Sequence, residues 1–177
     1  LAAEVLAAAF PSRVRDGAPR NAVEPVGVAA GMAASSLATG VLLSSVGTWG
    51  QLDGGAAIGG VGGGVIGLGI GALYASGEPV TAGQGLGFAS GVGWGLAGGL
   101  MATWAAVPQT APNVSARARE DWGAVFRAVG VGTGGALGAL ALRGDPQVAQ
   151  VLEYDAAGYL GSQIGWGLSR MALGPDL

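Results

Sequence analysis

Residues 83–97 read GQGLGFASGVGWGLA, and this stretch is compatible with two kinds of secondary structure. Glycine recurs at every fourth position, at Gly83, Gly87, Gly91 and Gly95. On a helix that spacing places the glycines in one row along a single face. Every odd-numbered residue of the stretch is also Gly or Ala, and such alternation is typical of a β-strand. An outer-membrane barrel strand would turn one of its faces to lipid.

Three acidic residues that precede prolines favour helices over strands. They form the pairs Glu24-Pro25, Glu78-Pro79 and Asp145-Pro146. Proline suits the first turn of a helix, because its missing N–H would be unpaired there, and the preceding acid can cap the free amides of that turn. A glycine precedes the last two pairs, which predicts that the previous helix ends on a left-handed glycine.

We therefore expect an all-α protein, with a transmembrane β-barrel bearing a Gly-rich face as the alternative. Residues 1–25 are predicted to form a short helix and an Arg/Pro-rich flanking loop, and residues 26–177 a Gly-rich helix bundle. The five long helices of that bundle are expected over residues 26–46, 54–75, 80–105, 121–142 and 147–172.

The distribution of charge indicates a membrane protein. Residues 25–52, 54–77 and 79–116 carry no charged side chain, and a helix of about 20 residues crosses the hydrocarbon core. The mean hydropathy of +0.51 agrees with this interpretation. The buried core of a large soluble assembly is the alternative. All eight basic residues are Arg, and the chain is rich in Gly, Ala and Val, which is typical of GC-rich bacterial genomes. We expect a polytopic protein of the bacterial cell envelope.

Glycine rows at four-residue spacing continue beyond the opening stretch. They comprise Gly59, Gly63, Gly67 and Gly71, then Gly83, Gly87, Gly91, Gly95 and Gly99, then Gly130, Gly134 and Gly138. Within lipid, helices associate by close backbone approach and dispersion, because the surrounding tails are as apolar as the helices. Runs of this length resemble the glycine-zipper class of membrane proteins. The resemblance implies helices that pack through these glycines and assemble into oligomers.

The tetrapeptide GWGL occurs at residues 93–96 and again at 165–168, and it belongs to a longer internal duplication. One copy covers about 49–96 and the other about 122–168. Both contain the same sequence features in the same order: Trp-Gly, a Gly-rich segment, Gly-acid-Pro and GWGL. Each copy is expected to supply two helices, so that the copies point the same way across the bilayer. The tryptophan of each GWGL is predicted to fill the space that its neighbouring glycines leave.

Four ionisable residues fall within predicted helices, where they would be costly and often functional: Asp53, Arg127, Glu153 and Asp155. Asp53 and Arg127 occupy similar places in the two copies, so parallel copies would let them pair, unless both face water among the headgroups. Glu153 and Asp155 lie two residues apart and point to different sides. A solvated start of the last helix would explain both. Asp53, Arg127 and Asp155 are the candidate polar residues.

Most enzyme classes are excluded by residue types that the chain lacks. Without Cys or His there is no thiolate or imidazole metal ligand and no Ser-His-Asp triad, so we predict no catalytic residue, metal or cofactor. A net charge of −3 without a basic stripe argues against nucleic acid. The partners expected are the lipid bilayer and further copies or other subunits of a membrane complex. The leading hypothesis is a non-enzymatic structural subunit of an oligomeric complex or pore. The alternative is a channel or transporter with a path at the repeat interface.

Overall fold

The computed structural model describes residues 24–77, 79–106 and 113–173, which form five α-helices and no strand. The predicted short helix and flanking loop lie outside these residues, apart from Glu24 and Pro25. The helices are α2 (Pro25–Trp49), α3 (Gly55–Gly77), α4 (Ala82–Ala106), α5 (Ala116–Gly144) and α6 (Val148–Leu173). The predicted five-helix, all-α fold is confirmed, and the barrel alternative is not supported. The opening stretch lies inside α4, so its fourfold glycine spacing and not its alternation determines the structure.

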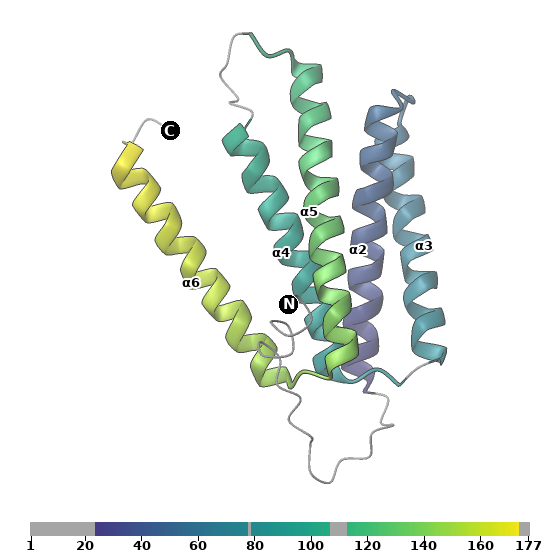
Figure 1. Ribbon diagram of the computed structural model, residues 1–177. Coiled ribbons are helices and arrows are strands. Elements are labelled where there is room, and N and C mark those ends of the chain that lie inside the picture. The colour runs from purple at the N-terminus through teal and green to yellow at the C-terminus, as the bar shows by residue number, and fades with distance from the viewer. Residues whose placement is uncertain (1–23, 78, 107–112, 174–177) are drawn as a thin grey trace.

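The helices alternate in direction along the chain (Figure 1). Antiparallel α2 and α3 pack side by side, as do α4 and α5, and α2 also contacts both α4 and α5. The last helix, α6, contacts α4 alone and diverges from the bundle towards its C-terminal end. In both predicted copies the first helix (α3 or α5) runs one way and the second (α4 or α6) the other. Within a copy, however, the two helices make no contact.

The buried core is small, and large apolar side chains face outward. Ala34, Val92 and Val131 form its centre, where α2, α4 and α5 meet. The outer surface of α3 carries exposed Ile58, Val61, Val65, Ile66, Ile70 and Leu73. Burial inside a soluble fold would cover such residues, whereas in a bilayer they are solvated by lipid chains.

Three of the five helices, α2, α3 and α5, are long and apolar enough to span a membrane. The membrane location predicted from the charge distribution therefore agrees with the structure. Among the described residues, α4 and α6 are not such candidates. Glutamines and acidic residues lower the mean hydropathy of α6.

The acidic residues before proline act differently from the prediction. Glu24 precedes α2 without a side-chain hydrogen bond to that helix. Helix α4 begins at Ala82, beyond Pro79, because Thr81 and Gln84 form a capping box. Its two hydrogen bonds run from Gln84 N–H to Thr81 Oγ1, at 3.2 Å, and from Thr81 N–H to Gln84 Oε1, at 3.0 Å.

The prediction that these helices end on left-handed glycines is also wrong. Gly77 and Gly144 are the last residues of α3 and α5, and neither has a positive φ. The residue after α5, Asp145, adopts the left-handed conformation instead, with φ 48°. Aspartate tolerates this region better than most side chains do. Helix α5 starts earlier than predicted, because the Ser115 hydroxyl accepts a hydrogen bond from an amide of its first turn.

Candidate functional site

The α4–α5 seam is lined by glycine on both helices. We define it by Gly91, Gly95 and Gly99 of α4 and Gly130, Gly134 and Gly138 of α5. A Cβ built at Gly95 would lie well under 3.0 Å from the Gly130 carbonyl oxygen, closer than real Cβ atoms come to any atom. The same is true of Gly134 against the Gly91 carbonyl. The two backbones are therefore in direct contact, and any side chain in the seam would push them apart.

The α2–α3 seam has a glycine row on α3, whereas α2 contributes both hydroxyl side chains and two glycines, Gly40 and Gly47. Gly59, Gly63, Gly67 and Gly71 of α3 all face the α2 backbone or its side chains. A Cβ at Gly63 would lie under 3.0 Å from the Thr39 carbonyl oxygen. The Thr39 hydroxyl in turn donates to the Gly63 carbonyl at 2.7 Å. The helices are thus held by close approach and by a hydrogen bond between them.

The remaining predicted packing glycines lie towards the start of α4. Gly83 faces the connection between α5 and α6, where a Cβ would collide with the Pro146 carbonyl oxygen. Gly87 occupies the same row of α4, between Gly83 and Gly91. Gly85, on another side of α4, contacts the Gly27 backbone of α2. Glycine on two sides lets α4 lie between two close neighbours.

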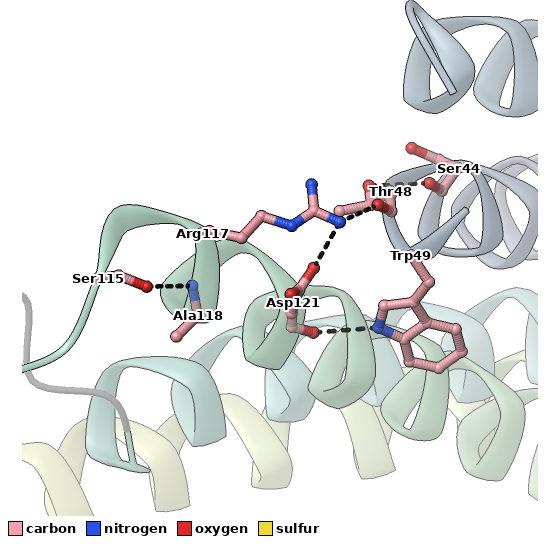
Figure 2. Close-up of polar contacts among 7 residues, drawn as sticks. All are labelled: Ser44, Thr48, Trp49, Ser115, Arg117, Ala118 and Asp121. Carbon is pink, nitrogen blue, oxygen red and sulfur yellow. Dashed lines mark hydrogen bonds and ion pairs between the residues drawn. The ribbon is translucent and has the colours of Figure 1, made fainter. Parts of the chain in front are cut away.

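A polar cluster joins the C-terminus of α2 to the first turns of α5 (Figure 2). Arg117 donates from Nη2 to the Thr48 carbonyl at 2.8 Å and forms an ion pair with Asp121 at 3.1 Å. The Trp49 indole N–H donates to the Asp121 carbonyl at 3.3 Å. The last carbonyls of a helix lack intrahelical partners and carry partial negative charge, so a guanidinium is favourable there. These contacts fix the position of α5 along α2.

A second polar cluster lies at the opposite end of the bundle. The Glu24 carboxylate accepts a hydrogen bond from the Ala82 N–H, at 2.7 Å, and so caps α4 instead of its own helix. Thr81 Oγ1 donates to the Asp145 carboxylate at 2.8 Å, and the Gln84 side-chain amide donates to a carbonyl in the last turn of α5. Acidic residues placed before proline thus tie neighbouring helices together.

Asp155 forms the contact between α6 and α4. Its Oδ1 accepts a hydrogen bond from the Trp94 indole N–H, at 2.8 Å, and another from the Ser90 hydroxyl. The Trp94 ring lies against Gly158, where a Cβ would come within 2.9 Å of it. Asp155 is therefore a partnered residue of the α4–α6 interface. Glu153 is exposed, and the Trp166 side chain lies outside the described part of the chain.

Asp53 and Arg127 do not form the pair that the duplication would allow. Asp53 lies exposed in the turn between α2 and α3, whereas Arg127 is half-buried on α5. No ion pair joins these two described residues. Nη1 of Arg127 lies 3.1 Å from the position of a Cβ at Gly123, one turn nearer the start of α5. No hydrogen bond or ion pair links its guanidinium to another described residue.

Arg127 lines a groove of about 390 Å³ that opens between three helices. We call it the Arg127 groove and define it by Ser36, Gly40 and Ser44 of α2, Gly60 and Gly64 of α3, and Arg127. The sequence singled out Arg127 but missed the two serines. Their spacing of eight residues, which puts both on one helix face, was the available signal.

Within the described residues, no group of three or more His, Cys, Asp or Glu side chains could hold a metal ion. Asp53, Arg127 and Asp155 lie in three separate environments and form no joint site. Comparisons of this chain with protein-family models, with curated proteins and with solved structures give no match.

Proposed function

We propose that this protein is a non-enzymatic, integral membrane structural subunit of an oligomeric complex or pore in the bacterial envelope. The observation that carries the proposal is the use of glycine. Two seams bring helix backbones into contact, while the large apolar side chains of α3 face outward. This arrangement suits a rigid framework in lipid, where packing takes the place of the hydrophobic effect.

Helix α6 supports the oligomeric part of the proposal. The glycine row of α3 packs against α2, and that of α5 packs against α4 of the same chain. Neither row is therefore left to contact a second copy. By contrast, α6 contacts α4 alone and exposes Leu152, Tyr159, Leu160, Ile164 and Leu168. A helix with so little packing against the other described helices gains most from packing against a neighbouring subunit, which makes α6 the expected point of assembly.

A channel or transporter path at the repeat interface is less well supported. The α4–α5 seam belongs to that interface, and its backbones touch, which leaves no room for a solute between them. Asp155, a candidate polar residue there, is already bonded to Ser90 and Trp94. Reconstituted vesicles can separate the two functions, since a transporter would lose its flux when Arg127 or Asp155 is replaced by Ala.

Cysteine cross-linking tests the structural proposal directly, because the native chain has no cysteine. We expect Ile164→Cys, on exposed α6, to give disulfide-linked dimers in native membranes. The matched control is Leu73→Cys on α3, where the side chain is also exposed, at 74% against 63% for Ile164. Native mass spectrometry of the unmodified chain should show more than one copy. A monomeric mass together with no Ile164 cross-link, to itself or to another protein, would refute the proposal.

A further inference from the structure

We propose that the Arg127 groove binds the phosphate group of an anionic membrane lipid. Its walls come from α2, α3 and α5, which are the three helices long and apolar enough to span a membrane. A ligand that enters between such helices comes from the bilayer. The groove holds polar side chains at a place where the adjoining surface of α3 is apolar, which is the arrangement that a lipid with a charged head and apolar tails requires.

The charge of the groove is unbalanced. Among the described residues that line it, Arg127 alone is charged, and no described acidic residue pairs with it. An arginine on a membrane helix is costly, and such residues normally pair with an opposite charge or with a ligand. The guanidinium presents a planar fork of donors that matches phosphate oxygens. An anion in the groove would supply the counter-charge that the protein does not.

Hydroxyl groups of α2 provide further hydrogen-bond donors in the groove. Ser45 and Thr48 each donate to a carbonyl four residues earlier on the helix, and the single Thr39 hydroxyl proton is shared between such a carbonyl and that of Gly63. Ser36 and Ser44 line the groove, and neither hydroxyl donates to a described residue. Ser44 is therefore free to donate to a phosphate oxygen at the depth of Arg127, whereas Ser36 lies about 12 Å further along α2, beside the acyl chains. The Ser44 hydroxyl and the unpaired guanidinium line the same groove, so both can donate to one anion.

Glycine leaves the room that a phosphate needs. Gly40, Gly60 and Gly64 contribute bare backbone to the walls. A Cβ built at Gly60 would make only ordinary contact with the Ser44 side chain, at 3.8 Å, whereas one at Gly40 or Gly64 would meet its neighbour at 3.1 or 3.3 Å, so the open part of the groove lies beside Gly60. A volume of about 390 Å³ lies within the usual range for a small-molecule site.

The depth of Arg127 agrees with a headgroup. Trp49 and Trp122 are exposed near the ends of α2 and α5, where indoles mark the membrane interface. Arg127 follows Trp122 by five residues, which is about 7.5 Å along a helix. Its guanidinium reaches back to Gly123, towards the interface. Leu37 and Val41 also line the groove and can contact the acyl chains further in.

Lipid binding by the full chain in nanodiscs tests the proposal, with retained lipids counted by native mass spectrometry. The probes are phosphatidylglycerol, zwitterionic phosphatidylcholine and inorganic phosphate. We expect Arg127→Gln to weaken phosphatidylglycerol binding about tenfold, the loss of one charge-assisted hydrogen bond. The matched control is Arg143→Gln, which removes an exposed arginine of the same helix outside the groove and should leave this binding unchanged.

Two further variants keep the test decisive if Arg127→Gln disturbs the fold. Arg127→Lys retains the charge without the fork and should lose binding severalfold, while Ser44→Leu fills the groove and should abolish binding with Arg127 intact. Tight binding of inorganic phosphate by the wild type would show that the same donors bind a soluble anion and not a lipid. Equal phosphatidylglycerol binding by the wild type and all the groove variants would overturn the proposal, as would an equal loss in Arg143→Gln.

Discussion

The two glycine-lined seams solve the same packing problem with different chemistry. In the α4–α5 seam glycine faces glycine, and each backbone fills the space left by the missing side chains of the other. In the α2–α3 seam the glycine row of α3 faces a helix with hydroxyl side chains and only two glycines, Gly40 and Gly47, and Thr39 adds a hydrogen bond between the helices. Close approach therefore does not need a full glycine row on both partners.

The two seams also differ in their surroundings. Helices α4 and α5 are both in contact with α2, whereas α3 contacts α2 alone. A strain in the α2–α3 seam can be relieved when α3 moves outward into lipid. A strain in the α4–α5 seam must also disturb the contacts of both helices with α2. The same substitution is therefore expected to cost more in the central seam than in the outer one.

The largest effect is expected from Gly95→Ala in the α4–α5 seam. The added methyl would collide with the Gly130 carbonyl, and overpacking of this kind should lower the free energy of unfolding by about 3 kcal/mol. Tryptophan fluorescence during SDS unfolding of the detergent-solubilised protein measures it. Gly93→Ala is the control, because a Cβ there meets nothing within 4 Å. Equal stability of the two variants would contradict backbone contact in this seam.

A smaller loss is expected from Gly63→Ala in the α2–α3 seam, at about 2 kcal/mol, because α3 can shift away from α2. The same unfolding assay applies, with Gly62→Ala as the control, since a Cβ at Gly62 lies in open space. A loss larger than that of Gly95→Ala would reverse the ranking of the two seams and show that the outer helix is not free to relax.

The smallest effect is expected from Thr39→Val, which removes the hydrogen bond to Gly63 while keeping the shape of the side chain. Hydrogen bonds between membrane helices contribute about 0.6 kcal/mol on average, so we expect a loss of that size. Thr103→Val is the matched control, because the Thr103 hydroxyl donates to Gly99 within its own helix. A double-mutant cycle with Gly63→Ala should give a non-zero coupling energy. Additive effects would argue that the bond contributes nothing to the seam.

Much of the fold could be predicted because helix signals act locally. The fourfold glycine spacing, the charge-free segments and the prolines placed all five helices within a few residues. The exact starts of α4 and α5 were missed, because Thr81 and Ser115 cap these helices and no proline marks the caps. Asp145 and Glu24 were expected to cap their own helices, and instead they bond across to α4 and its N-terminal cap.

The sequence by itself determined which residues can be buried in close helix contacts, because only glycine leaves a backbone bare and its spacing puts the bare positions on one face. The tertiary structure decided which helices share these faces. It paired α2 with α3 and α4 with α5, left α6 on α4 alone, and separated Asp53 from Arg127. Spacing along a chain specifies a face but not its partner, since the partner depends on how all the helices fit together in space.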